Sequence, residues 1–137
     1  MNPKILKLSQ GEVMIWISKV HKSWSPGEIA RAEYMLDTME KYFNLHNAII
    51  EVEFKKSNKD YFGLTEKCSK NHVLITLYKN KKIKRTVVHE MTHAKQFINK
   101  ELGYQLQWHG SKKWANAPYS KQPWEKEAMK MEEVFAK

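Results

Sequence analysis

The chain has 137 residues, of which 42% are hydrophobic and 28% charged, a composition typical of one globular domain over 1–137. No run approaches the roughly 20 apolar residues that cross a bilayer, so we expect no membrane segment. Cys68 is the only cysteine, which excludes an internal disulfide, and no secretory leader pattern is present, so we expect a cytoplasmic protein. The net charge of +9 favours anionic partners.

Two capping patterns predict helices in the first third of the chain. Ser9-Gln10-Gly11-Glu12 has capping-box spacing and precedes an apolar run, which predicts a first helix near residues 10–20. Ser25-Pro26-Gly27-Glu28 is the stronger pattern, because Ser25 can cap, Pro26 suits the first helical position and Glu28 can complete the box. Apolar residues recur behind it at helical spacing and predict a helix over 26–43.

The hydrophobic period then changes from helix to strand and back. Ile50, Val52 and Phe54 alternate with glutamates, which predicts a half-buried strand. A β-branched run predicts a second strand over 73–78, with a shorter one near Tyr61-Phe62. The remaining predictions are a helix over 83–99, irregular structure over 103–122 and a final helix that begins at Pro123. This order indicates an α+β domain with a small, mostly antiparallel sheet.

The sequence His89-Glu90-Met91-Thr92-His93 lies inside the predicted helix over 83–99. Residues four apart on a helix lie on one face about 6 Å apart along the axis, so the two imidazoles can converge on one Zn²⁺ ion. Glu90 lies beside that face, close enough to hydrogen-bond a metal-bound water without binding the metal. The alternative is two helical histidines beside a surface glutamate. Flanking apolar residues make the helix central, which favours the metal interpretation.

A catalytic zinc site usually has three protein ligands, and three residues compete for the third position. On a helical wheel of the last helix, Glu127 falls within the apolar arc and Glu125 falls outside it. A carboxylate on a core-facing stripe needs a metal or a charged partner, so we expect Glu127 to be the third ligand. An ion pair of Glu127 with a lysine is the alternative. Glu125 is expected to face solvent or to support a ligand, and His109 in the following loop also remains within reach.

The blocks His89-Glu90-x-x-His93-Ala94-Lys95-Gln96, Trp108-x-Gly110 and Tyr119 to Ala128 together resemble a group of small phage-encoded metallopeptidases. Glu127-Ala128 also resembles the glutamate-bearing helix of gluzincins and of ImmA/IrrE-like peptidases. His109-Gly110-x-x-Trp114 resembles the third-ligand segment of SprT-like proteases. One departure from gluzincins of the thermolysin type is Met131, which stands where that pattern has an aspartate.

The resemblance implies a compact zincin-like domain, a minimal gluzincin, with a central helix carrying the histidines and a C-terminal helix supplying the third ligand. It implies one Zn²⁺ ion and a protein or peptide substrate, hydrolysed by a metal-activated water with Glu90 as general base. Tyr119, His109 and Tyr104 are candidate oxyanion donors, and the strand over 72–78 is a candidate for pairing with an extended substrate. A phage origin would place the protein in the host cytoplasm or the virion.

Basic residues crowd the start of the helix over 83–99, where positive charge opposes the helix dipole. They are Lys79, Lys81, Lys82, Lys84 and Arg85. This run could contact nucleic acid or an acidic substrate, although a solvated lysine-rich loop is the simpler interpretation. Two other functions therefore remain open: a basic nucleic-acid-associated protein of the SprT-like kind, and a zinc-binding virion or interaction protein without turnover.

Overall fold

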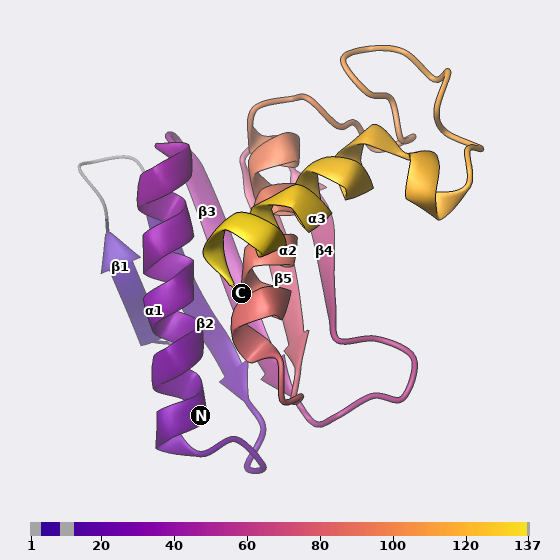
Figure 1. Ribbon diagram of the computed structural model, residues 1–137. Helices are drawn as coiled ribbons and strands as arrows, with labels where there is room; N and C mark the ends of the chain where they lie inside the picture. Colours follow the sequence, from indigo (N-terminus) through magenta and orange to yellow (C-terminus); the bar gives the residue numbers. More distant parts are fainter. Residues whose placement is uncertain (1–3, 9–12, 137) are drawn as a thin grey trace.

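The computed structural model describes residues 4–8 and 13–136, in which three long helices pack on a five-stranded sheet (Figure 1). This arrangement confirms the predicted α+β class. In chain order the elements are β1 (Lys4–Leu8), β2 (Val13–Val20), α1 (Pro26–Phe43), β3 (Ala48–Lys55), β4 (Gly63–Ser69), β5 (His72–Tyr78), α2 (Ile83–Ile98), the short 3-10 helix η1 (Tyr119–Lys121) and α3 (Pro123–Phe135).

The sheet is mixed, so the prediction of a mostly antiparallel sheet is wrong. Its strand order is β1-β2-β3-β5-β4; β2, β3 and β5 run parallel, and the two edge strands β1 and β4 pair antiparallel with their neighbours. The connection from β2 to β3 passes through α1, and such a helical crossover returns the chain to the same end of the sheet. Parallel pairing of β2 with β3 follows from that connection.

The helix predicted near residues 10–20 is also wrong, because residues 13–20 form strand β2. Val13, Ile15 and Ile17 are buried and alternate with partly exposed residues, and the segment pairs along its length with β3. The β-branched and aromatic side chains of this run suit that pleated, half-buried position. The Ser9 to Glu12 capping pattern lies outside the described residues.

Helix α1 begins and ends where its sequence pattern indicates. The Ser25 hydroxyl accepts from the backbone N–H of Glu28, and the Glu28 carboxylate accepts from the backbone N–H of Ser25 at 2.7 Å. Pro26 occupies the first helical turn, and Asn44 ends the helix with a left-handed φ of 52°. Its buried face carries Ala32, Met35, Leu36 and Met39, so α1 packs on the core as predicted.

The helices lie on one face of the sheet, and α3 crosses over α2 (Figure 1). Inward-facing residues of β2, β3 and β5 meet them in one hydrophobic core, which includes Ile15, Ile50, Val52 and Ile75. Helix α2 is central, because it contacts α1, α3, β4 and β5. None of the helices in the described ranges is long and apolar enough to cross a membrane.

Two details of the second half differ from the sequence interpretation. The strand expected near Tyr61-Phe62 begins at Gly63 and continues to Ser69. Its polar sequence belongs to an edge strand, so the hydrophobic alternation of a half-buried strand is weak there. Residues 103–122 are irregular as predicted, apart from η1 and isolated bridges that join Trp108 to Leu102 and to Ser111.

Candidate metal centre

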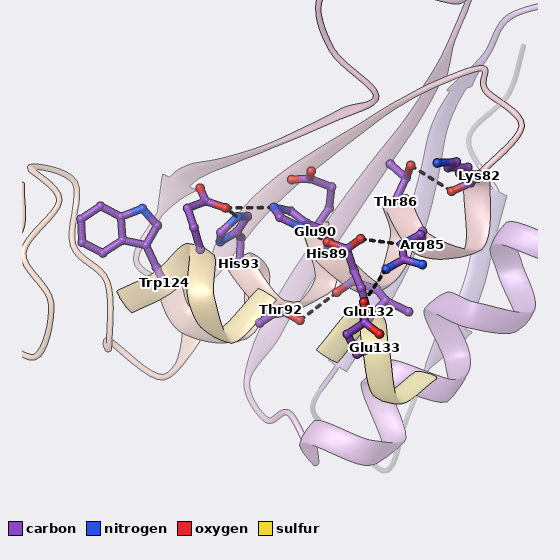
Figure 2. Close-up of polar contacts among 12 residues, drawn as sticks. Lys82, Arg85, Thr86, His89, Glu90, Thr92, His93, Trp124, Glu132 and Glu133 are labelled. Atoms are coloured by element: carbon purple, nitrogen blue, oxygen red, sulfur yellow. Dashed lines mark hydrogen bonds and ion pairs between the residues drawn. The ribbon is translucent and has the colours of Figure 1, made fainter. Parts of the chain in front are cut away.

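Helix α2 places His89, Glu90 and His93 beside a cleft of about 660 Å³. One helical turn separates the two histidines, and their ring centroids lie 4.8 Å apart. Figure 2 shows their side chains, with that of Glu90, on the same stretch of α2. The predicted helix therefore brings the motif together as expected.

The first turn of α3 brings Glu125 to both histidines. Oε1 of Glu125 lies 3.0 Å from Nε2 of His89 and 3.1 Å from Nε2 of His93. Among the described residues, His89, His93 and Glu125 are the one group of three or more His, Cys, Asp or Glu side chains that could hold a metal ion. Their ligand atoms lie within 4.8 Å of one another.

The far side of each ring is held by a hydrogen-bond acceptor. Nδ1 of His89 donates to Oε2 of Glu132 at 2.6 Å, and Nδ1 of His93 donates to Oε1 of Gln96 at 2.8 Å. The amide orientation of Gln96 follows from its other contacts, because its Nε2 lies near two groups that only accept, the Trp124 carbonyl and the Glu127 carboxylate. Both rings therefore carry a proton on Nδ1, and in its neutral form each ring directs the Nε2 lone pair at Glu125.

This donor set fits a divalent cation. If both rings are neutral, two Nε2 lone pairs and a carboxylate oxygen face one another at hydrogen-bond distance with no proton between them. Protonation of the rings or a shared cation removes that repulsion. Tetrahedral zinc with bonds near 2.1 Å holds neighbouring ligand atoms about 3.4 Å apart, a few tenths of an ångström more than the 3.0 Å and 3.1 Å between Glu125 and the two histidines. Two imidazoles and one glutamate also form a known catalytic zinc ligand set.

The electrostatics of the cluster also favour positive charge between these side chains. Burial alone would lower the pKa of His89, but hydrogen bonds with Glu125 and Glu132 raise it to about 9. Burial alone would raise the pKa of Glu125, but hydrogen bonds with the two histidines hold it well below its usual range. The centre therefore retains protons on nitrogen and a charged carboxylate when no metal neutralises it.

Glu90 is buried at the wall of the cleft, with 6% of its surface exposed. The Thr65 hydroxyl on β4 lies 2.7 Å from Oε1 of Glu90 and 3.0 Å from its backbone carbonyl. Burial raises the pKa of Glu90, although the neighbouring His93 and His89 oppose that shift. Gly63 allows β4 to approach this closely, because a Cβ there would lie 2.8 Å from Cγ of Glu90.

Glu132 connects the centre to a surface ion pair. Its Oε1 accepts from Nε of Arg85 at 2.9 Å, while its Oε2 accepts from His89. Arg85 also donates to Glu133 at 3.0 Å, and Figure 2 shows this group beside His89. Glu132 thus supplies the orienting carboxylate that the sequence, with Met131 at the expected position, did not reveal.

Glu127, the predicted third ligand, lies elsewhere. Its carboxylate forms an ion pair with Lys95 at 2.7 Å and accepts from Gln96 at 2.9 Å. This is the lysine ion pair that the sequence left open as the alternative. The structure therefore brings Glu125, and not the predicted Glu127, into the group of described residues that could hold a metal.

The other two candidates have different surroundings. His109 is exposed, stacks edge-on against Trp108 and does not belong to the metal-capable group of the described residues. Tyr119 lines the cleft from η1, and burial, followed by the charge and hydrogen bond of Glu125, raises the pKa of its hydroxyl. Tyr119 thus lies at the centre, whereas His109 and Tyr104 are absent from the cleft lining.

Sequence reasoning missed Glu125 because it required a ligand to lie on the apolar arc of the last helix. The cleft lies at the margin of the α2–α3 contact, where a carboxylate can reach the histidines without entering the core. A usable signal was present. Glu125 and Glu132 are seven residues apart and therefore share one face of α3, which matches two histidines on one face of α2.

No protein-family model matches the chain, and neither the curated proteins nor the solved structures contain a match. What this chain does must therefore be inferred from the chemistry of the residues at this centre.

Proposed function

We propose that the protein is a zinc-dependent peptide hydrolase whose metal ligands are His89, His93 and Glu125. The observation that carries the proposal is the convergence of two Nε2 atoms and Oε1 of Glu125 beside the buried Glu90, at the wall of an open cleft. A structural zinc site is closed by a fourth protein ligand, whereas a catalytic site keeps one position open. Three ligand groups among the described residues, facing a cleft, support catalysis.

When bound, zinc supplies a Lewis acid for the substrate carbonyl and lowers the pKa of water towards about 7. Glu90 acts as general base and then as general acid. Thr65 engages its Oε1, which leaves Oε2 to take the proton of the attacking water and deliver it to the leaving amine. Burial raises the pKa of Glu90, which makes its carboxylate a better proton acceptor than an exposed glutamate.

Two further features support a peptide as substrate. Tyr119 places a hydroxyl at the cleft, beside Glu125, where it can donate to the carbonyl oxygen as negative charge develops. The strand β4 contributes Gly63, Leu64 and Thr65 to the cleft wall and lies at one end of the strand order. An extended peptide can pair with this edge. β5, over the range 72–78 suggested from sequence, is paired on both sides and has no free edge.

Substitution Glu90→Gln tests the proposal. The variant should retain stoichiometric zinc, measured by elemental analysis, because Glu90 is not among the three ligands. Hydrolysis of an unstructured protein such as casein should fall by at least about a thousandfold, because the proton acceptor is lost. Unaltered proteolysis in Glu90→Gln, or purified wild type that takes up no zinc, would overturn the proposal.

A further inference from the structure

A second hollow of about 560 Å³ adjoins the cleft at the start of α2. Lys82 and Arg85 line both the hollow and the cleft, so a ligand that extends along α2 from Glu90 meets the hollow next. Arg31 of α1 and Lys81 and Lys84 complete its basic lining.

Arg85 is paired with Glu132 and Glu133, but the other cations of the hollow form no hydrogen bond or close ion pair in the described part of the chain. Within the described part of the chain, the side chains of Arg31, Lys81, Lys82 and Lys84 form no hydrogen bond or ion pair, and all four residues are exposed. The acidic lining residue, Glu28, is already engaged, since its carboxylate caps α1 and lies 3.7 Å from Lys79. The hollow therefore carries an excess of unneutralised positive charge.

These lysines do not stabilise the helix at whose start they lie. The first turn of α2 contains no acidic residue, whereas the first turns of α1 and α3 contain Glu28 and Glu125. Positive charge at a helix N-terminus opposes the helix dipole. Their concentration beside the cleft is better explained by an anionic ligand than by the stability of the fold.

The chemistry of the lining favours a peptide over nucleic acid. No aromatic side chain among the described residues lines the hollow, so bases have no ring there on which to stack. Tyr61 and Phe62, both exposed by more than half, line the cleft instead, where they suit the apolar side chains of a peptide. Acidic side chains are the peptide groups that unpaired lysines select.

We propose that this hollow is a subsite for acidic side chains of the peptide whose scissile bond lies at Glu90, an inference that rests on the proposed hydrolase function. Lys82 precedes Glu90 by eight residues, which corresponds to about 12 Å along α2. An extended peptide covers that distance in about three or four residues. The protein therefore selects chains with glutamate or aspartate about three or four positions from the cleaved bond.

Binding to the zinc-loaded Glu90→Gln protein tests this selection without turnover. The probes are fluorescein-labelled peptides that carry two glutamates on one or the other side of a central apolar pair, and matched peptides with glutamine in place of glutamate. Fluorescence anisotropy should show about tenfold tighter binding of a glutamate peptide than of its glutamine match. The difference should shrink as salt rises from about 50 to 500 mM.

The triple substitution Lys81→Ala, Lys82→Ala and Lys84→Ala in that background should remove the preference. The matched control is the triple variant Lys70→Ala, Lys112→Ala and Lys130→Ala, which removes the same charge from exposed positions outside the cleft and the hollow. It should keep the preference for glutamate within about twofold. Thermal melting of the first triple variant should show no loss of stability, because unfavourable charge leaves the start of α2.

Equal binding of glutamate and glutamine peptides overturns the inference. An equal loss of the glutamate preference in the two triple variants also overturns it. A labelled single-stranded DNA oligomer that binds more tightly than the glutamate peptides, and depends on the same lysines, overturns it in favour of nucleic acid. Failure of the hydrolase proposal has a different signature. Wild type would then leave every peptide uncleaved, whereas failure of the acidic subsite alone leaves wild type cleaving glutamate and glutamine peptides at equal rates.

Discussion

Two glutamates that are two residues apart on α3 have entirely different surroundings. Glu125 faces the cleft and meets Nε2 of His89 and of His93, whereas Glu127 meets the ammonium of Lys95 and the amide of Gln96. Both carboxylates are partly buried and both are paired. The difference shows that the face of α2 opposite a carboxylate decides its role, since the histidine face offers imidazole nitrogens that can release a proton and bind a metal, whereas an ammonium group can only pair with the carboxylate.

Two clusters can be distinguished, a histidine cluster of His89, His93 and Glu125 and a lysine cluster of Lys95, Glu101 and Glu127, and they are physically connected. Gln96 is fully buried, donates to Glu127 and accepts from Nδ1 of His93. Lys95 holds Glu127 in place and is itself held by Glu101 at 2.7 Å. The lysine cluster therefore fixes the ring orientation of one predicted ligand without contacting the metal position.

The largest expected effect is the difference in zinc affinity between variants of the two glutamates. Glu125→Ala should lower zinc affinity by more than about a hundredfold, because it removes a ligand. Glu127→Ala should lower it by no more than about tenfold, because it loosens only the support of His93. Competition with a chromophoric chelator measures both. Strong loss in Glu127→Ala with retention in Glu125→Ala would show that the sequence-based ligand was correct.

The next prediction concerns the stability of zinc-free protein, to which the two clusters should contribute with different dependence on pH. The pKa of His89 rises from 6.5 to about 9 on folding. Its contribution to the free energy of unfolding is therefore complete below pH 6.5 and is lost as pH rises through 9. Glu125 has a lowered pKa, so its contribution is present above pH 4.5 and is lost as pH falls further. The free energy of unfolding should therefore fall by up to about 3 kcal/mol between pH 6.5 and 9.

Urea denaturation of chelator-treated protein across this range measures the effect. Glu125→Gln should flatten the profile, because the main acceptor for the charged ring is gone. The lysine cluster should contribute nothing in this window. Burial lowers the pKa of Lys95, but hydrogen bonds with Glu101 and Glu127 outweigh it and raise the pKa above 10.5. An unchanged slope in Glu125→Gln would contradict the assignment.

Loss of the buried lysine in the lysine cluster should destabilise the fold without removing a metal ligand. Lys95 is buried, and Lys95→Met leaves Glu101 and Glu127 without their cation, which should cost about 2 kcal/mol of unfolding free energy after allowance for their partial exposure. Lys130→Met is the control, since it removes the same charge from an exposed residue and should change stability by less than about 0.5 kcal/mol. Equal effects in the two variants would show that the cluster is energetically neutral.

The smallest expected effect concerns the close approach of β4 to the cleft face of α2. A Cβ at Gly63 would lie 2.8 Å from Cγ of Glu90 and 2.9 Å from Cγ2 of Thr86, so Gly63→Ala must displace the proposed base. We expect kcat to fall about tenfold with zinc content unchanged, a loss of about 1.4 kcal/mol. Gly27→Ala is the matched control, because its added Cβ meets nothing within 4 Å. Wild-type kcat in Gly63→Ala would show that Glu90 needs no such space.

Local sequence patterns were sufficient to predict the structure of much of the molecule. The capping box at Ser25 and the apolar period behind it define α1, and the four-residue spacing of His89 and His93 places them together on any helix. These predictions succeeded because each depends on contacts within one or two helical turns. The prediction for residues 13–20 failed because their apolar run suits both a helix and a strand, and pairing with β3 decides between them.

The histidine pair and Glu90 on a central helix were determined by sequence alone, since helical geometry makes their convergence local. Which glutamate joins them depends on how α3 crosses α2, and that crossing is set by packing between residues more than 30 positions apart. The same crossing brings Glu132 to His89, and the register of β4 brings Thr65 and Gly63 to Glu90. Only the tertiary structure decides these contacts, because no local pattern encodes the relative position of two packed elements.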